Sequence, residues 1–355
     1  MISKILRAKF IYKNPTSHKI LIYDKLSEKF AKVLFPKNSY HIFDARYESL
    51  NIPIFFKTLL ENGFKDLSEN YKKNYIKKIN PKIVYTSIDN SLGFYKLKKL
   101  FNNPIYISDQ NGMRDNTFVD NCKNYLKVKK NINLKCDYLF TFGLNEKKRL
   151  SNLIEGRKLP LGNTLNNYYL NQSRKIKNKI LFISSGINNK KIFNKDAIIF
   201  KHLINLCNNK SYQLSFLSRP NNQAEKVLKN KFPSKNWNLL VGKNRGEIYK
   251  LLSKFEIIIF AHSTLGYEAL ARGYKCISFN NHFFPHHKFL YKRSGPFWSQ
   301  DISFNVIKKI LLKVKNYKEK EWLLISKKYS KELMSYDKSN IKKLKIIKKI
   351  LKKTY

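Results

Sequence analysis

The chain has no apolar stretch of the roughly 18 residues that a membrane-spanning helix needs. Basic side chains interrupt residues 1–13, so the apolar core of a secretory signal peptide is also absent. These two absences predict a protein that stays in the cytoplasm.

Closely spaced cysteine pairs are absent too. The four cysteines stand at positions 122, 136, 207 and 276, without a CxxC spacing, and Cys136 and Cys276 lie in apolar segments typical of a reduced protein core. His282, His286 and His287 share one loop, but no carboxylate or cysteine pattern accompanies them. We therefore expect no metal site and assign these histidines to substrate contact or partial burial.

Acidic residues are scarce, with 24 Asp and Glu against 71 Lys and Arg, which gives a net charge of +47. Nucleic-acid binding, attraction to an anionic membrane and a genome rich in A and T could each produce this excess. Lysines are spread along the chain, and Asn and Ile are abundant as well. Because nucleic-acid binding does not explain Asn and Ile, we expect no nucleic-acid partner.

The 355 residues are enough for two domains of ordinary size. In the first half, strand-like segments alternate with helical patterns, which indicates a parallel, doubly wound sheet. The predicted strands are 19–24, 41–45, 83–87, 104–107 and 138–142, and the predicted helices are 26–34, 54–63 and 90–101.

A second alternation follows a lysine-rich segment. Its predicted strands are 180–183, 213–217, 237–241, 257–260 and 275–279, with helices at 198–206 and 244–252. We therefore expect an α/β fold of two Rossmann-like, doubly wound domains with a ligand cleft between them. The expected boundaries are 1–172 for the N-terminal domain, 173–179 for a linker, 180–302 for the C-terminal domain and 303–355 for basic helices.

Residues 255–279 predict a strand, a helix cap, a short helix and a second strand. His262, Ser263 and Thr264 stand where the helix begins, Glu268 lies inside it, and Gly273 stands where it should end. A helix N-terminus at the carboxyl edge of a sheet favours anions, because its free amides and its dipole both attract negative charge. The alternative is that Ser263 and Thr264 only cap the helix and that Glu268 is solvated.

This segment, from His262 to Cys276, reads HSTLGYEALARGYKC. It resembles the T/S-S-x-x-G-F/Y-E-A-L-x-x-G-K-x-V pattern of GT-B glycosyltransferases of surface-carbohydrate and capsule biosynthesis, including capsule β-Kdo transferases. The resemblance implies two Rossmann-like domains facing across a cleft, a nucleotide-sugar substrate and no metal or other cofactor. It also implies that Ser263 and Thr264 bind phosphate and that Glu268 contacts ribose or sugar hydroxyls.

The loop after the strand at 104–107 reads Asp109-Gln-Asn-Gly-Met-Arg114. The corresponding loop of the capsule transferases is close to E-D-G-F-x-R, with its Asp in the catalytic role, whereas Asn111 occupies that position here. An amide cannot act as a general base. Either Asp109 or Asp115 takes over, or Asn111 binds donor or acceptor. Asp109 is the best carboxylate candidate, Arg114 completes the motif, and the alternative for Asp109 is a plain turn residue.

Three further segments end predicted strands of the C-terminal half. Arg219 and Pro220 stand where cytidine-nucleotide-using relatives have a basic residue followed by His-Pro, which indicates contact with a nucleotide phosphate. The resemblance places Ser184, Ser185 and Gly186 at a donor pyrophosphate or sugar, and Gly242 beside the nucleobase.

Residues 338–354 predict a helix with apolar residues at helical spacing and lysines over the rest of its surface. Such a helix could lie on the anionic inner face of the cytoplasmic membrane, or pack on the protein with a solvated lysine face. The sequence leaves both readings open.

Together these features predict a glycosyltransferase that moves a sugar from a nucleotide-activated donor, with CMP-linked sugars among the options, to a surface polysaccharide or a lipid-linked glycan. The alternatives are a transferase for a polyol phosphate, such as glycerol phosphate, and a basic nucleic-acid-binding protein.

Overall fold

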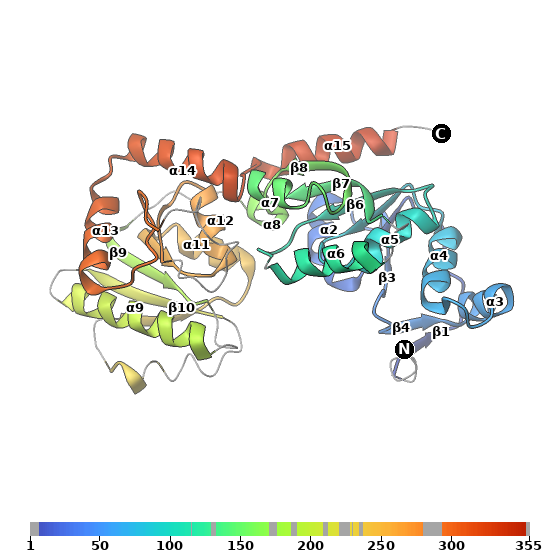
Figure 1. Cartoon of the computed structure of the whole chain (residues 1–355), viewed down its shortest axis with the longest axis horizontal. Coiled ribbons are helices and arrows are strands. Elements are labelled where there is room, and N and C mark those ends of the chain that lie inside the picture. Colours follow the sequence, from blue (N-terminus) through green and yellow to red (C-terminus); the bar gives the residue numbers. More distant parts are fainter. Residues whose placement is uncertain are drawn as a thin grey trace. The chain divides into compact units, whose positions relative to one another are not determined.

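A computed structural model describes ten segments of the chain, which divides into two compact units. Unit 1 comprises Met1–Tyr168 and Asp337–Tyr355, and unit 2 comprises Tyr169–Tyr336 (Figure 1). The described residues are 7–114, 116–128, 133–169, 176–185, 190–208, 212–219, 228, 230–233, 237–279 and 293–352, without the side chains of 190–193.

Unit 1 is built on a six-stranded sheet in the order β3-β2-β5-β6-β7-β8, in which every pair is parallel. Apolar residues that alternate along the strands enter two different core clusters, so helices cover both faces, as a doubly wound sheet requires. The strands are β2 (Ile20–Tyr23), β3 (Tyr40–Phe43), β5 (Ile83–Thr86), β6 (Ile105–Asp109), β7 (Lys135–Thr141) and β8 (Glu155–Pro160). The helices are α2 (Glu28–Leu34), α5 (Leu92–Leu100), α6 (Asn116–Val128), α7 (Leu144–Arg149), α8 (Thr164–Tyr168) and α15 (Ile341–Lys352).

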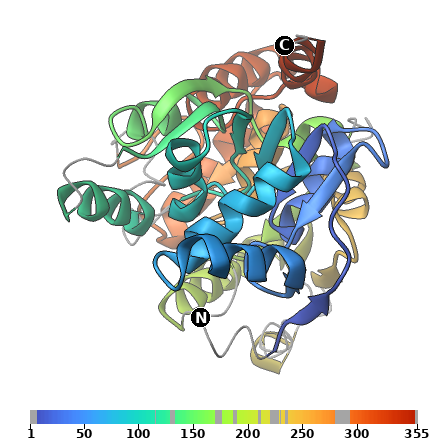
Figure 2. The same ribbon diagram turned by 90° about the vertical axis from the view of Figure 1, so that its right-hand side faces the viewer.

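A smaller part of unit 1 stands beside this sheet. Strand β1 (Lys9–Ile11) pairs in parallel with β4 (Ser49–Asn51), and α3 (Ile52–Asn62) packs on α4 (Leu67–Ile79). Figures 1 and 2 both show α3 and α4 side by side. Of these four elements, only α3 was predicted from the sequence.

Unit 2 has a five-stranded parallel sheet in the order β11-β10-β9-β12-β13. Strands in chain order run outward from β9 through β10 to β11, and the chain then continues on the other side of β9. The topological switch point therefore lies between β9 and β12. The strands are β9 (Ile176–Ile183), β10 (Gln213–Ser218), β11 (Trp237–Val241), β12 (Phe255–Phe260) and β13 (Lys275–Ser278); the helices are α9 (Lys190–Asn208), α11 (Arg245–Leu252), α12 (Thr264–Ala271), α13 (Phe304–Asn316) and α14 (Glu319–Leu333).

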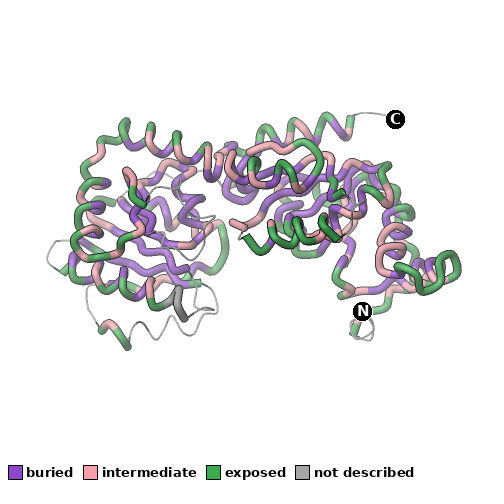
Figure 3. The backbone as a smooth tube through the Cα atoms, viewed as in Figure 1, coloured by how far each residue is buried: buried purple, intermediate pink, exposed green. Residues whose placement is uncertain are grey.

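Both sheets confirm the predicted α/β fold of Rossmann-like units, and Figure 3 shows their strands as the most buried parts of the chain. The limits of the units differ from the expected boundaries. Strand β9 begins at Ile176, inside the expected linker 173–179, and the expected segment 303–355 is divided between the two units.

Helix α15 packs on unit 1. Its Ile347 and Ile350 are buried in the same core cluster as Ile22 and Tyr85 of the sheet, and Leu344 and Leu351 pack against that cluster. The sequence left open whether this basic helix lies on a membrane or packs on the protein. In the structure its apolar side packs on the protein. Among the described helices, none combines the length and the apolar composition of a membrane span.

Candidate functional site

Helix α12 begins and ends as predicted. Ser263 is its N-cap residue, and its side chain makes no capping hydrogen bond. At the other end, Gly273 has a φ of +83°. The amide of Gly273 donates to the carbonyl of Leu270 at 2.9 Å and the amide of Tyr274 donates to that of Ala269 at 3.1 Å, which completes a Schellman motif.

Gly266 lets α12 approach β12 closely. A Cβ atom at Gly266 would lie 2.0 Å from Cγ of Phe260. The helix therefore lies tightly on the strand that precedes it, and its N-terminus stands at the carboxyl edge of the unit 2 sheet.

Ser185 connects the ends of β9, β10 and β12 by hydrogen bonds at the carboxyl edge of the unit 2 sheet. Its Oγ donates to Oδ1 of Asp196 at 3.0 Å and accepts from the backbone amide of His262 at 3.1 Å, which connects the ends of β9 and β12. Arg219, which follows β10, donates from Nη2 to the carbonyl of Ser185 at 2.6 Å. The structure thus brings the predicted residues Ser185, Arg219 and His262 together at the topological switch point, where α/β sheets bind ligands.

Asp196, on α9, is the residue of this group that the sequence analysis missed. Its Oδ2 also accepts from the amide of Ser185 at 2.8 Å, and the side chain is buried. An acidic residue two positions before the predicted helix 198–206 was the available signal, and its burial follows from the longer helix that the structure has.

Glu268 is fully buried, which corrects its expected contact with ribose or sugar hydroxyls. Its Oε2 accepts from the hydroxyl of Tyr249 at 2.7 Å and from Nη1 of Arg245 at 3.2 Å. Burial and the nearby Glu268 charge both raise the pKa of Tyr249, so the phenol remains a donor. The side chain of Arg245 is 42% exposed, so Arg245, rather than Glu268, is the member of this group that reaches solvent.

The remaining residues predicted to bind the donor differ in their exposure to solvent, and the structure does not describe all of them. Ser184 and Ser263 are buried at the strand ends, and Thr264 is partly exposed. Gly242 follows the edge strand β11, and a Cβ atom there would lie 2.3 Å from Cγ1 of Ile248, so tight packing of α11 accounts for this glycine. The predicted residues Gly186 and Pro220, together with Asp115 and the histidines at 282, 286 and 287, lie outside the described residues.

In unit 1, Asp109 is also fully buried, which removes the best carboxylate candidate of the sequence analysis. Its Oδ2 accepts from the hydroxyl of Tyr85 at 2.9 Å, and its Oδ1 accepts from Nζ of Lys343 at 2.7 Å. Lys343 is equally buried and donates to the carbonyl of Gly162 and the hydroxyl of Thr164 as well. Burial lowers the pKa of Lys343, while Asp109 opposes that shift. Asp109 thus serves to hold α15 on the sheet.

Asp89, which follows β5, organises the loop that ends in Arg114. Nε of Arg114 donates to Oδ2 of Asp89 at 2.8 Å, and the backbone amide of Asn111 donates to Oδ1 at 3.2 Å. Nη2 of Arg114 also donates to Oδ1 of Asn111 at 2.6 Å. The predicted pair Asn111 and Arg114 is therefore held by one buried carboxylate, which stands just before the predicted helix 90–101.

Glu146, on α7, is the second carboxylate that the sequence analysis missed. Its Oε1 accepts from Nη1 of Arg149 at 2.5 Å, and the same nitrogen donates to the carbonyl of Arg114 at 3.1 Å. Its Oε2 is buried and has no hydrogen-bond partner among the described residues. Burial raises the pKa of Glu146, and Arg149 offsets part of that shift. A Glu and an Arg three residues apart on the helix after a buried strand were the available signal.

We call Asp89, Asn111, Arg114 and Glu146 the loop cluster. Its members follow β5, β6 and β7, whose carboxyl ends share one edge of the unit 1 sheet. A carboxyl group whose pKa is raised above its ordinary value can accept or donate a proton in a reaction. The cluster therefore combines a titratable carboxylate with an amide and a guanidinium that can bind polar groups.

One protein family matches part of the chain. The profile of a family described as "putative O-antigen biosynthesis protein" matches residues 185–351, which is slightly less than half of the sequence and includes the switch point of unit 2. None of the curated proteins matches the chain.

Solved structures resemble nearly the whole chain at low sequence identity. A "putative UDP-N-acetylglucosamine 2-epimerase" from Listeria monocytogenes has a TM-score of 0.61 and 11% identity, with 96% of this chain and 98% of that one covered. UDP-GlcNAc 2-epimerase from Methanocaldococcus jannaschii, in complex with UDP-GlcNAc and UDP, has a TM-score of 0.54 and 14% identity over 94% and 99%. Sucrose-phosphate synthase from Thermosynechococcus elongatus has a TM-score of 0.53 and 12% identity over 95% and 99%. The chain thus shares the GT-B-like, Rossmann-type fold of these proteins.

Proposed function

We propose that this protein is a glycosyltransferase that uses a nucleotide-activated sugar to build a surface polysaccharide or a lipid-linked glycan in the cytoplasm. The observation that carries the proposal is the convergence of Ser185, Arg219 and His262 at the switch point of unit 2. This site lies within the region similar to O-antigen biosynthesis proteins. The complex of the Methanocaldococcus neighbour with UDP-GlcNAc and UDP further supports a nucleotide-sugar ligand.

The donor would be held by its phosphates. The N-terminus of α12 offers the positive end of its helix dipole and the hydroxyl of Ser263, which makes no cap bond. Arg219 and the exposed part of Arg245 add positive charge, and Glu268 keeps Arg245 in place. Such a set of donors can stabilise the charge that develops on a leaving phosphate, so the proposed reaction needs no metal ion.

The loop cluster would act on the acceptor. In a glycosyl transfer, an acceptor oxygen bonds to the anomeric carbon, the bond from that carbon to the donor phosphate breaks, and the acceptor hydroxyl loses its proton. We assign that proton to Oε2 of Glu146, because this oxygen has no hydrogen-bond partner among the described residues, whereas both carboxylate oxygens of Asp109 accept hydrogen bonds and Asn111 has no basic group. Asn111 and Arg114 would orient the acceptor.

A second candidate is epimerisation of a nucleotide-sugar, which the names of two structural neighbours favour. An epimerase converts its substrate without an acceptor. Incubation with a nucleotide-sugar alone, followed by product analysis, therefore separates the two candidates.

Nucleotide binding is the first test. We expect one of CMP, CDP, UDP, GDP and ADP to raise the thermal unfolding midpoint, since a ligand at a hundred times its dissociation constant adds about 2.7 kcal/mol of stability. Arg219→Ala should lose most of this shift while unfolding as the wild type does without ligand. Tyr12→Ser, at an exposed position in unit 1, serves as the control and should keep it. If no nucleotide shifts the midpoint of the wild type, the proposal fails.

A further inference from the structure

The surface of α3 exposes large apolar side chains. Phe56 is 58% exposed and Leu60 is 88% exposed, while Phe64, just beyond the helix, is 86% exposed. Phe10 and Tyr12, at and beside the neighbouring strand β1, are exposed as well. We call Phe56, Leu60 and Phe64 the α3 patch. Figure 3 shows α3 as largely exposed, in contrast to the strands of the sheet.

The contacts of α3 with α4 show which side of α3 remains uncovered. Ile54 and Thr58 are buried, and Oγ1 of Thr58 accepts from Nδ2 of Asn74 on α4 at 3.1 Å. Phe56 and Leu60 stand four residues apart and so share a different face of the helix. That face has no covering element among the residues that the structure describes.

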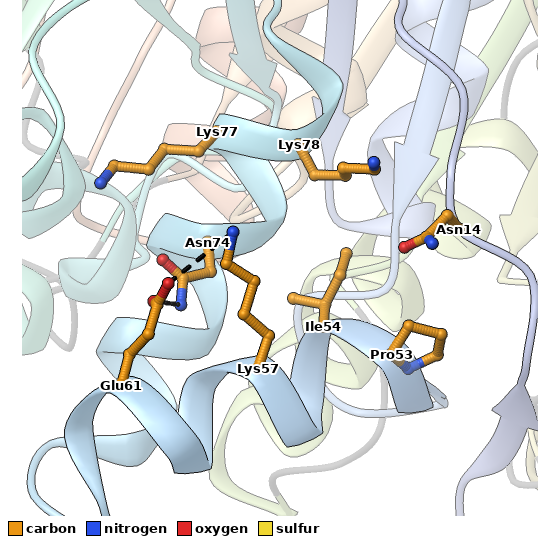
Figure 4. Close-up of a pocket in the computed structure, with 8 residues that line it drawn as sticks. All are labelled: Asn14, Pro53, Ile54, Lys57, Glu61, Asn74, Lys77 and Lys78. Atoms are coloured by element: carbon orange, nitrogen blue, oxygen red, sulfur yellow. Dashed lines mark hydrogen bonds and ion pairs between the residues drawn. The ribbon is translucent and has the colours of Figure 1, made fainter.

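Three lysines lie in a pocket beside α3. Figure 4 shows a pocket of about 450 Å³ between α3 and α4, lined by Lys57, Lys77 and Lys78 together with Asn14, Pro53, Ile54, Glu61 and Asn74. Glu61 accepts from Asn74 at 2.9 Å and lies 3.7 Å from Nζ of Lys57. Within the described parts of the chain, Lys77 and Lys78 have no ion-pair partner. The pocket therefore offers cationic groups to an external anion.

We propose that the α3 patch docks on an anionic lipid bilayer. Its apolar side chains would enter the boundary between headgroups and acyl chains, and Lys57, Lys77 and Lys78 would meet lipid phosphates. This pairing of an apolar face with neighbouring lysines is typical of helices that lie in a membrane interface. The proposal does not depend on the transferase activity, although it would bring unit 1 to lipid-linked acceptors.

Charge favours a bilayer over a second copy of the chain. The whole protein carries +47, and residues 52–79 contain six lysines against three acids. Two copies that met through this patch would bring like charges together, whereas an anionic surface attracts them. Helix α15 is the other basic candidate, but its apolar side is already packed on the unit 1 core.

Vesicle binding tests the proposal. The full chain should sediment with vesicles that mix phosphatidylcholine and phosphatidylglycerol, and should stay in solution with phosphatidylcholine alone. F56S/L60S should weaken binding at least about tenfold. K77E/K78E should weaken binding to the anionic vesicles in the same assay.

Two single variants are matched controls at exposed apolar positions: Leu324→Ser on α14, 71% exposed, and Ile341→Ser on α15, 62% exposed. Both should bind as the wild type does, and thermal unfolding of each variant checks its fold.

Fluorescence tests insertion directly. The three native tryptophans, Trp237, Trp298 and Trp322, are buried, so they give a steady background. Phe64→Trp should add emission that shifts to shorter wavelength only when anionic vesicles are present. An unshifted spectrum with bound vesicles, or loss of binding in Ile341→Ser but not in F56S/L60S, would overturn the assignment. A second copy of the chain would be the occupant if sedimentation equilibrium showed a wild-type dimer that F56S/L60S dissociates, and if vesicles bound neither the wild type nor the variant. That pair of results would also overturn the assignment.

Discussion

At the scale of single residues, Asp109 and Glu146 show how surroundings decide what a carboxylate can do. Asp109 has hydrogen bonds to Tyr85 and Lys343, and it is closed off from solvent. Glu146 is almost as deeply buried, yet one of its oxygens has no hydrogen-bond partner among the described residues. A carboxylate that is incompletely hydrogen-bonded and desolvated holds its proton more tightly, and so it can exchange that proton in a reaction.

The raised pKa of Glu146 predicts a pH-dependent effect of Glu146→Gln. The unfolded chain ionises Glu146 near pH 4.3, whereas the folded chain keeps the proton to higher pH. Between the pKa of Glu146 in the unfolded chain and its higher pKa in the folded chain, the folded wild type loses stability as the pH rises. The variant has no carboxyl group at this position and avoids that loss. We expect the free energy of unfolding of Glu146→Gln, relative to wild type, to increase from pH 4 upward when measured by urea titration.

Glu48→Gln is the control for this titration, because Glu48 is exposed and lies outside the loop cluster. A relative stability of Glu146→Gln that falls with rising pH would contradict the expected direction. Loss of glycosyl transfer in the same variant would address its proposed role as a base separately, since an amide cannot accept the proton.

At the scale of elements, α15 is attached to unit 1 by an apolar side and by one buried ion pair. Lys343 donates to Asp109, Thr164 and Gly162, which satisfies the ammonium group inside the protein. Burying two charges gains little net stability, but removing one partner leaves the other uncompensated. The pair therefore specifies where the helix sits more than it adds to stability.

Lys343→Met should accordingly lower the free energy of unfolding by about 3–5 kcal/mol, because it leaves Asp109 charged and buried. Urea denaturation would measure the loss. The double variant Lys343→Met, Asp109→Asn should recover much of it, and Lys345→Met, at an exposed position of the same helix, is the matched control. Equal losses in Lys343→Met and Lys345→Met would show that the ion pair does not matter.

Most strands of both sheets and the limits of α12 could be predicted from the sequence, because buried parallel strands are continuous apolar runs and helix ends carry cap residues. Helices α4 and α6 were missed, since their apolar residues are interrupted by Lys and Asn. The burial of Asp109 could not be predicted, because its partner Lys343 lies 234 residues away and looked like one surface lysine among many.

At the scale of the whole molecule, a net charge of +47 makes the folded chain repel itself. Salt screens such repulsion, and the Debye length falls to about 8 Å at physiological ionic strength. We expect the thermal unfolding midpoint to rise between low and physiological sodium chloride and then to level off. A midpoint that falls over this range would show that screened attractions, such as the ion pair of Arg114 and Asp89, outweigh the repulsion.

The path of the chain through its units also bears on synthesis. Unit 2 is a continuous segment, whereas unit 1 takes its last helix from the end of the sequence. During translation, unit 2 can fold as soon as its own residues emerge. In unit 1, Asp109 has no partner until Lys343 has been made. Unit 1 is thus completed only after unit 2 has been made.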